Sequence, residues 1–336
     1  MISLDKRRIS LVGGAGFIGH NLALALNKRG AEVQVIDGLQ VNNLLSFASF
    51  NTEIQNREFY SKIIHQRLEL LHDKGIALVV QDARDYHALS RVIVDFDPQV
   101  VIHLAAVAHA NKSNKDPYST FDNSSRTLEN ALDIAKIQKI EHFIFLSSSM
   151  VYGNFPEGYV TEDTCCEPLG IYGALKFGGE KLIIAYNQVF DLPYTIIRTS
   201  ALYGERCVSR RIGQIFIENA LQGMEVSING DGSDRLDFTY VNDLSNGIIK
   251  VLENDNSKNQ IFNLTYGESQ SINKMAAILK EHFPDIKFNY LPKDRLMPSR
   301  GTLSVEKARK LIGYEPQFPL EKGFVDYIKW YKETFK

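Results

Sequence analysis

The chain has 336 residues, which is enough for one large domain or two modest ones with an ample hydrophobic core. Its 38 Lys and Arg residues against 40 Asp and Glu give a net charge of −2. This balance gives no reason to expect a nucleic acid or a membrane as partner, although a local cluster of arginines can still bind an anion. Three cysteines are too few for a disulfide framework, no apolar run approaches the roughly 18 residues of a membrane span, and the polar start shows no signal peptide. These features predict a cytoplasmic protein.

Short apolar segments alternate with helical patterns over the first two-thirds of the chain. The segments with the pattern of buried strands are 9–12, 32–36, 77–80, 100–104, 142–146 and 194–198. Short apolar strands separated by helices predict an α/β fold, a doubly wound parallel sheet covered on both faces. The stretch 41–75 is long for a connection between two strands and is mostly helical in pattern.

The pattern changes after Gly204. In chain order it predicts a turn-rich stretch at 223–232, a return strand at 238–241, a helix at 271–282, an irregular stretch at 284–298 and a last amphipathic helix that ends in 327–331. We therefore expect two domains. A Rossmann domain takes 1–203 with a return segment at about 237–266, and a smaller, partly discontinuous substrate-binding domain takes 204–236 and 267–336.

Three glycines with the spacing of a dinucleotide-binding turn lie between the first strand and the first helix: Gly13, Gly16 and Gly19. Glycines there let the backbone approach a pyrophosphate, whose charge the N-terminus of the helix stabilises. Asp37 closes the second strand, where a carboxylate accepts hydrogen bonds from the adenosine ribose and repels a 2′-phosphate. The pattern thus favours NAD over NADP, the alternative for Asp37 being a turn residue before Gly38.

Two further residues follow the third strand. Asp82 and Ala83 lie where an adenine contact is expected, and capping of the next helix is an equal explanation for Asp82.

A tyrosine and a lysine lie four residues apart on one predicted helix face, at Tyr172 and Lys176. The unperturbed phenol has a pKa near 10, so it needs help to act as a base at neutral pH. A nearby ammonium, a nicotinium charge and a hydroxyl hydrogen bond can together provide that help. We expect Tyr172 to be the general acid-base, Lys176 to tune it and to bind the nicotinamide ribose, and Ser148 to hold the reacting oxygen.

At this point the sequence resembles the extended short-chain dehydrogenase/reductase family, in its NAD-dependent nucleotide-sugar epimerase/dehydratase group. The resemblance to UDP-glucose 4-epimerase-like enzymes covers essentially the full length. It rests on the segments 13–19, 103–106, 147–153, 172–176, 198–204, 230–233, 237–243 and 306–314.

The resemblance implies further site residues. Beside the glycines and carboxylates above, it places in the cofactor cleft Phe17, Ile18, Leu104, Ala105, Ala106 and Asn123. On the substrate side, next to Ser148, it implies Ser113, Ser149, Arg206, Arg211, Arg235 and Arg300, the arginines for the nucleotide or its diphosphate. For each arginine a solvated surface position is the alternative. No metal site is expected.

The sequence departs from the family pattern at Leu236, Ala201 and Arg126, and we expect all three to lie around the nucleotide-sugar pocket. Another departure bears on the reaction, because 4,6-dehydratases of this family carry Asp-Glu after the active hydroxyl. Ser149 and Met150 stand there instead, and a thioether cannot transfer a proton. This disfavours a dehydratase and also a related decarboxylase.

The resemblance together with Asp37 therefore favours an NAD-dependent nucleotide-sugar 4-epimerase, which oxidises sugar C4 transiently and returns hydride to the opposite face. A nucleotide-sugar C4 dehydrogenase or 4-keto reductase stays open, as does a non-catalytic NAD-binding sensor. The family likeness also implies a homodimer through a four-helix bundle, built from 117–135 and 171–190 of each subunit. Neither the base nor the sugar of the substrate follows from the sequence.

Overall fold

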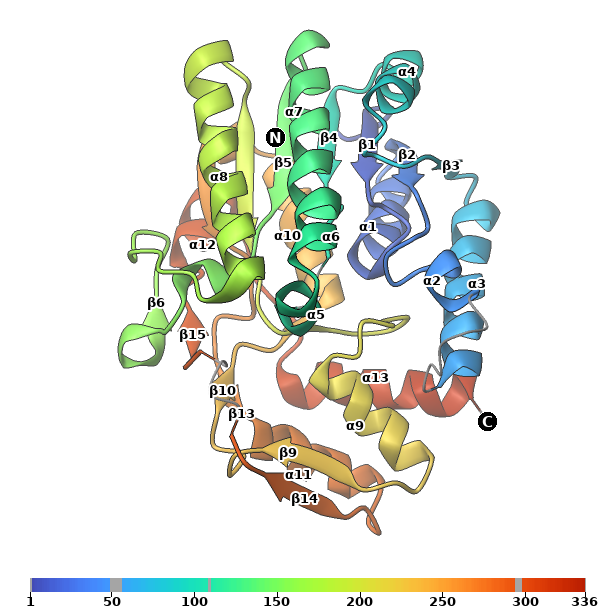
Figure 1. Ribbon diagram of the computed structural model, residues 1–336, viewed down its shortest axis with the longest axis vertical. Coiled ribbons are helices and arrows are strands. Elements are labelled where there is room, and N and C mark those ends of the chain that lie inside the picture. The colour runs from blue at the N-terminus through green and yellow to red at the C-terminus, as the bar shows by residue number, and fades with distance from the viewer. Residues whose placement is uncertain (1, 49–55, 108–109, 294–297, 336) are drawn as a thin grey trace.

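Seven parallel strands form the central sheet in the computed structural model, which describes residues 2–48, 56–107, 110–293 and 298–335 (Figure 1). The strand order is β12-β7-β5-β4-β1-β2-β3, and each neighbouring pair is parallel. The strands are β1 (Arg8–Val12), β2 (Glu32–Asp37), β3 (Ala77–Val80), β4 (Val100–His103), β5 (His142–Leu146), β7 (Tyr194–Arg198) and β12 (Gln260–Asn263). The doubly wound fold predicted from the sequence is confirmed.

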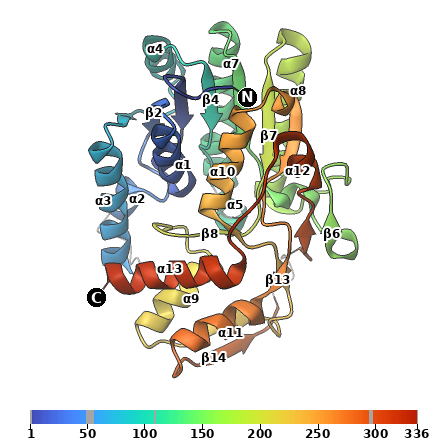
Figure 2. The same cartoon turned by 180° about the vertical axis from the view of Figure 1, so that it is seen from behind.

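Helices cover both faces of this sheet (Figures 1 and 2). One face carries α1 (Phe17–Lys28) and α10 (Val241–Leu252), and the other carries α4 (Tyr86–Phe96), α7 (Thr127–Ile137) and α8 (Gly170–Phe190). Successive side chains of a strand point to opposite faces, so each strand contributes to two cores. Ile102, for example, packs in the core with α1 and α10, while Val101 packs in the core with α4, α7 and α8. This double burial explains the uninterrupted apolar runs of the strands.

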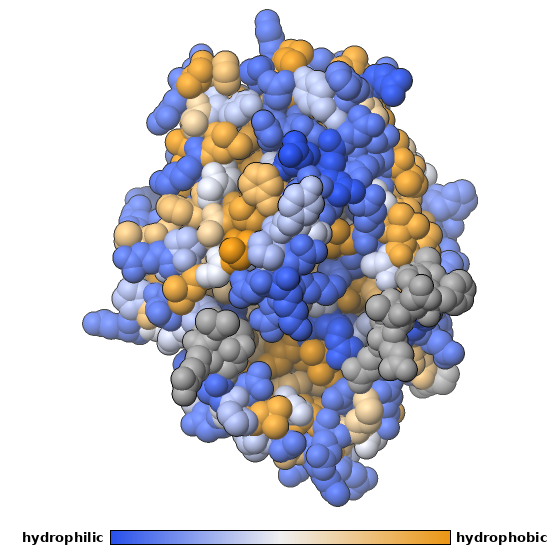
Figure 3. All heavy atoms as spheres, in the orientation of Figure 1, coloured by the Kyte–Doolittle hydropathy of each residue, from blue (hydrophilic) through white to orange (hydrophobic). Residues whose placement is uncertain are grey.

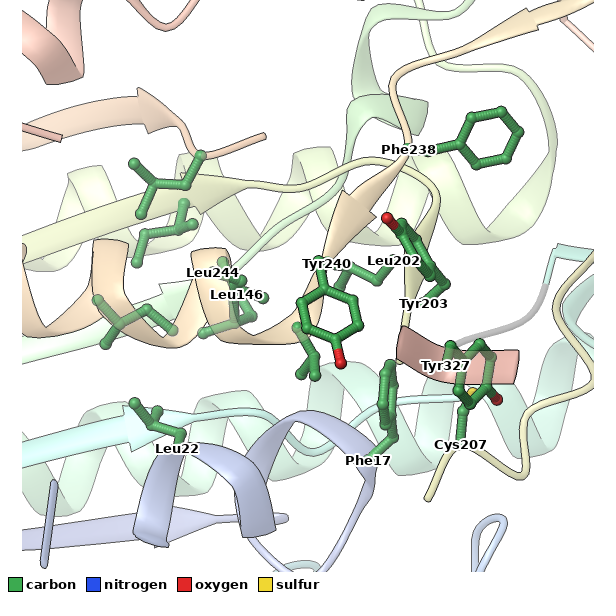
Figure 4. Close-up of a cluster of buried hydrophobic side chains, with 14 of the residues drawn as sticks. Phe17, Leu22, Leu146, Leu202, Tyr203, Cys207, Phe238, Tyr240, Leu244 and Tyr327 are labelled. Carbon is green, nitrogen blue, oxygen red and sulfur yellow. The ribbon is translucent and has the colours of Figure 1, made fainter. Parts of the chain in front are cut away.

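The core on the α1 side continues beyond the sheet (Figure 4). There Phe17 of α1 lies near Tyr240 and near Tyr327, which comes from the last helix, α13 (Leu320–Thr334). The ring centroids of Tyr203 and Tyr240 are 5.4 Å apart, and those of Tyr203 and Tyr327 are 6.4 Å apart. The amphipathic helix predicted at the C-terminus thus packs its apolar face on this core.

The return strand expected at 238–241 is shorter than predicted and does not join the main sheet. It covers only Thr239–Tyr240 (β11) and pairs with β8 (Leu202–Tyr203) outside the main sheet, and α10 begins at Val241. The carboxylate of Asp237 just before it is buried and accepts the N–H groups of Tyr266 and Leu303, which ties the chain to other segments there. β12 completes the main sheet instead.

A second group of elements lies below the sheet in Figure 1. It comprises α9 (Ile212–Leu221), β9 (Val226–Asn229), α11 (Ile272–His282) and β14 (Phe288–Leu291), and β9 pairs with β14 in parallel. These strands fall in the stretches that we expected to be turn-rich or irregular, so both expectations missed a strand. β9 has only two buried residues, Val226 and Ile228, and so short an alternation is hard to recognise.

The remaining elements connect these layers. The helical ones are α2 (Leu44–Ala48), α3 (Arg57–Asp73), α5 (Ala110–Lys115), α6 (Pro117–Phe121) and α12 (Glu306–Ile312), with a π-helical turn at Asp122–Arg126 and 3₁₀ turns at Ser149–Tyr152, Pro156–Gly158 and Asp255–Ser257. The strand pairs are β6 (Tyr159–Val160) with β15 (Thr302–Leu303) and β10 (Arg235–Leu236) with β13 (Gln270–Ser271). Across the described ranges, no helix is both long and apolar enough to cross a membrane.

Candidate active site

A groove lies at the carboxyl ends of the central strands, where open parallel sheets bind their ligands. Every residue predicted for the cofactor outside α8 lines it: Gly13, Gly16, Phe17, Ile18, Gly19, Asp37, Asp82, Ala83, Leu104, Ala105, Ala106 and Asn123. Asn123 lies in the π-helical turn at Asp122–Arg126, an irregularity that is frequent at functional sites. The structure thus brings together residues that are more than a hundred positions apart in the sequence.

The glycine turn is shaped for the close approach of a ligand to the backbone. Gly13 has a φ of +81°, and a Cβ there would lie 2.5 Å from the backbone nitrogen of Ala105. At Gly19 a Cβ would lie 2.4 Å from the carbonyl oxygen of Gly14, so both positions require glycine. A Cβ at Gly16, by contrast, meets no protein atom closer than 3.5 Å, and Gly16 lines the groove. Its missing side chain leaves room there for a dinucleotide.

Asp37 lies in the groove and also forms the turn contact that was the alternative explanation for it. It lines the groove, and its two carboxylate oxygens accept the N–H groups of Ala15 at 3.0 Å and Leu39 at 2.7 Å. The bond to Leu39 is the turn-forming contact that was the alternative explanation. Burial raises the pKa of Asp37, partly offset by these two hydrogen bonds. Each oxygen keeps a second lone pair, so the carboxylate can still accept hydrogen bonds from a ribose.

Asp82 is not a helix cap. The residue that caps α4 is Asp85, whose side chain accepts the N–H of Ala88. Asp82 instead pairs with Arg84 at 2.6 Å, and this hydrogen bond lowers its pKa. Gln40 from the loop after β2 also donates to Asp82, at 3.0 Å. These contacts fix the carboxylate at the wall of the groove.

The residues predicted for catalysis come from β5 and α8. Ser148 and Tyr172 line a second hollow, and the Ser148 hydroxyl lowers the pKa of the Tyr172 phenol. Ser148 follows β5, and its hydroxyl accepts the N–H of Met150 at 3.2 Å, which starts a 3₁₀ turn. Tyr172 lies in the first turn of α8, where a Cβ at Gly173 would lie 2.7 Å from the carbonyl oxygen of Met150. This close packing holds the phenol beside the serine.

Lys176, which we expect to tune Tyr172 and to bind the nicotinamide ribose, is held by the end of β5. Its Nζ donates to the carbonyl oxygen of Leu146 at 2.5 Å and lies over the ring of Phe145, 4.6 Å from the centroid. Burial lowers the pKa of Lys176 to about 8. Burial likewise raises the pKa of Tyr172, and the groups that lower it are Arg211 and Ser148. The protein's own groups therefore leave the phenol protonated at neutral pH.

Ser147, the first serine of the run after β5, belongs to a buried polar network. Its hydroxyl donates to Glu180 of α8 at 2.5 Å, and Glu180 forms an ion pair with Arg198 of β7 at 2.7 Å. Both charged side chains are at most 3 % exposed. The network joins two neighbouring strand ends to the helix that carries Tyr172.

The second hollow lies between the sheet and the lower group of elements. A space-filling view of this face shows hydrophobic side chains on the floor of a hollow at that place (Figure 3). Of the residues predicted to bind substrate, those that line it are Ser148, Ser149, Arg211, Arg235 and Arg300. Leu236 and Ala201, two departures from the family pattern, line it too, whereas Arg126 pairs with Asp122 at 2.9 Å.

Two arginines of this pocket repel each other. Burial and, second to it, the positive charge of Arg211 lower the pKa of Arg300 to about 10. The Nε of Arg211 is buried and has no hydrogen-bond partner. Two half-buried cations with an unused donor fit an anionic group such as a diphosphate. Among the described residues Arg211 alone lines both hollows, so it marks the place where they meet.

Two predicted substrate residues lie elsewhere. The guanidinium of Arg206 donates to Nε2 of His20 at 3.0 Å and to Asn21 at 3.2 Å, so it packs on α1 rather than on the pocket. The reason is local, since Arg206 has a φ of +62° and turns its side chain onto that helix. Ser113 is fully buried in α5 and lines neither hollow.

Several lining residues were missed by the sequence interpretation. Arg67 and Ser209 line the cofactor groove, and Asn111, Thr199 and Lys293 line the pocket. Arg210, which lines the pocket as well, was predicted as part of a basic cluster with Arg206 and Arg211. Arg67 lies on α3, inside the stretch 41–75, whose unusual length was the only hint. Within the described residues no group of His, Cys, Asp or Glu could hold a metal ion.

Comparison with known proteins agrees with this geometry. A UDP-glucuronic acid 4-epimerase from Bacillus cereus, solved with UDP-glucuronic acid and NAD, is 28% identical with a TM-score of 0.86, covering 98% of this chain and all of that one. A UDP-glucose 4-epimerase from Thermotoga maritima, solved with UDP-glucose, is 25% identical with a TM-score of 0.85 and the same coverage. A UDP-glucuronate 4-epimerase of Thermodesulfobacterium geofontis is 26% identical over 97% of this chain and 96% of that protein. Residues 9–265 match the model of the NAD dependent epimerase/dehydratase family, and the chain belongs to that family.

Proposed function

We propose that the protein is an NAD-dependent nucleotide-sugar 4-epimerase. The observation that carries this proposal is that Ser148 and Tyr172 line one pocket, which meets the cofactor groove at Arg211. A sugar bound in the pocket can present one carbinol carbon both to this pair and to the groove. The relatives that bind UDP-sugars and NAD support the same function.

NAD held in the groove would supply the hydride chemistry of this function, which is acceptance of hydride from sugar C4 and its return to the other face of the sugar. Tyr172 takes the proton of the C4 hydroxyl while the C–H bond breaks, and it returns that proton after the 4-keto sugar has turned over. Ser148 donates a hydrogen bond to the reacting oxygen. Lys176, held on Leu146, would bind the nicotinamide ribose. The nicotinium charge is positive, so its proximity lowers the phenol pKa, which burial raises in the protein alone.

The substrate is held through its diphosphate and nucleoside. Arg211 and Arg300 supply the positive charge, and Arg235, which donates to Ser269, lines the nucleotide end of the pocket. Met150 lines the pocket directly beyond Ser148 and Ser149, and its thioether cannot transfer a proton at C5 or C6. This composition supports an overall reaction confined to C4.

The direct test is proton NMR of the purified protein with a panel of UDP-, GDP-, CDP- and dTDP-sugars and no added cofactor. The expected result is conversion of one sugar's anomeric and H4 signals to those of its C4 epimer. A 4-keto product with stoichiometric NADH absorbance would instead identify a C4 dehydrogenase or reductase. Binding of NAD and a protein partner without any turnover would identify a sensor.

Three further features belong to this proposal. The Rossmann domain would comprise 1–203 with about 237–266, and the substrate domain 204–236 with 267–336. A cytoplasmic location is consistent with a nucleotide-sugar substrate.

A homodimer would form through 117–135 and 171–190, which expose the apolar residues Tyr118, Phe121, Ile171, Leu182, Val189 and Phe190. Sedimentation velocity of the protein and of Val189→Asp tests the dimer, and an unchanged monomer in both would overturn it.

A further inference from the structure

Arg67 is a buried cation beside the cofactor groove that no motif accounts for. It lies on α3, is 1% exposed and lines the groove. Among the described residues, no carboxylate lies within ion-pair distance of its guanidinium. The carboxylate of Asp37 in the same groove acts on Arg67 only from beyond that distance. Burying an arginine without an ion-pair partner is unfavourable, so an anionic ligand beside it would stabilise it.

The three nitrogens of this guanidinium are used unequally. Nε donates to the carbonyl oxygen of Arg206 at 2.9 Å, and Nη2 donates to the same oxygen. Nη1 is buried and has no hydrogen-bond partner. The protein therefore occupies the Nε–Nη2 edge of the guanidinium. The N–H groups of Nη1 have no acceptor, and a buried charged donor needs one.

The neighbours of Arg67 place it at the start of α1. Its charge acts on His20, whose pKa is lowered by burial first and by Arg67 next. His20 lies in the first turn of α1, and its Nδ1 is 2.8 Å from the carbonyl oxygen of Gly16. A helix N-terminus after a glycine turn is where a dinucleotide diphosphate binds. Arg67 thus lies on the side of the groove where two phosphates are expected.

We propose that Arg67 binds the diphosphate of the cofactor, with Nη1 donating to a phosphate oxygen while Nε and Nη2 hold the carbonyl oxygen of Arg206. The same side chain then connects the cofactor with the loop 204–211, which carries Arg211. The left-handed conformation of Arg206, with a φ of +62°, presents its carbonyl oxygen to this arginine. The inference rests on the NAD cofactor of the proposed function but not on epimerisation.

The test measures binding without turnover, so its failure is distinct from failure of the epimerase proposal. Affinities for NAD, ADP-ribose, adenosine and NADP are measured by calorimetry on the full-length protein after removal of bound nucleotide. The variants are Arg67→Lys and Arg67→Met. Arg7→Lys is the matched control, because Arg7 is also buried with an unpartnered Nη1 but lines neither hollow. Thermal unfolding establishes that each variant is folded.

We expect both Arg67 variants to bind NAD and ADP-ribose about ten- to a hundredfold more weakly, the usual cost of a lost charged hydrogen bond. Adenosine affinity is expected to stay the same, and Arg7→Lys to bind all ligands as the parent does. Unchanged NAD affinity in a folded Arg67 variant would overturn the proposal, as would an equal loss for adenosine. A loss confined to NADP would also overturn it, because it would assign Arg67 to a 2′-phosphate.

A structure of the parent protein with NAD provides a check that needs no variant. The proposal expects Nη1 of Arg67 within hydrogen-bond distance of a phosphate oxygen, roughly 2.7–3.2 Å. A separation beyond about 4 Å, with a water or a ribose hydroxyl on Nη1 instead, would overturn it even if the variants do not fold.

Discussion

The cofactor groove and the substrate pocket are made from different parts of the chain. The groove consists of the ends of neighbouring strands and a glycine turn, so its shape comes mainly from the backbone of one sheet. The pocket draws its charged groups from loops and short strands, and its cationic lining residues are Arg210, Arg211, Arg235, Lys293 and Arg300. A site made from backbone is fixed by the fold, whereas a site made from side chains on loops can change its ligand by substitution. We infer that the pocket, and not the groove, sets which nucleotide sugar is bound.

The largest effect is expected where the two regions meet. Tyr172→Phe removes the hydroxyl that exchanges the C4 proton and leaves the ring, so kcat is expected to fall by about a hundred- to ten-thousandfold. NAD content and sugar-nucleotide affinity should change little, because neither the groove nor the arginines are altered. Turnover by NMR and NAD content by absorbance of the released nucleotide measure the two effects. Tyr118→Phe, at an 85% exposed tyrosine, is the matched control and should retain full activity.

The next largest effects separate two kinds of glycine in the groove. Gly19→Ala would force a Cβ to 2.4 Å from the carbonyl oxygen of Gly14, so it should lower the free energy of unfolding by about 1–3 kcal/mol even without NAD. Gly16→Ala meets no protein atom within 3.5 Å, so the protein should unfold at the same temperature as the parent. Its Cβ would instead occupy cofactor space and weaken NAD binding about tenfold or more. Equal destabilisation by both substitutions would contradict this distinction.

The pH dependence tests how Arg211 acts on the catalytic pair. The positive charge of Arg211 lowers the pKa of Tyr172, so Arg211→Gln should raise that pKa. The base must be deprotonated to act, and activity is therefore lost as pH falls through its pKa. In the variant this loss should begin at a higher pH, together with a rise of about tenfold in KM for the sugar nucleotide. Arg300→Gln is the control, since Arg300 is not among the groups that act on the pKa of Tyr172. In this variant KM for the sugar nucleotide should rise, and the pH at which activity is lost on the acidic side should not change.

The same contrast explains which features could be predicted from the sequence. The groove could be predicted because strand ends and a glycine turn are local patterns, and the parallel sheet brings their residues to one edge. The pocket could be predicted only in part, because Arg206 and Arg211 lie in one basic loop and only the left-handed turns at Arg206 and Arg210 decide which side chain faces the pocket. The hydrogen bond that holds Lys176 could not be predicted for a similar reason. Helical spacing puts Lys176 on the side of Tyr172, but the carbonyl oxygen of Leu146, which accepts its hydrogen bond, comes from β5.

The smallest effect is expected at the rim of the pocket. Lys293 lines it but already pairs with Asp234 at 2.5 Å, and the two side chains are 53% and 38% exposed. An exposed pair of this kind contributes about 0–1 kcal/mol, so Lys293→Ala should change KM by less than about fivefold and leave kcat and NAD content unchanged. If KM rose as much as in Arg300→Gln, the diphosphate would lie at the rim rather than between Arg211 and Arg300. The diphosphate of the substrate would then lie near Lys293, just after the end of β14. The sugar nucleotide would in that case be bound further from α9.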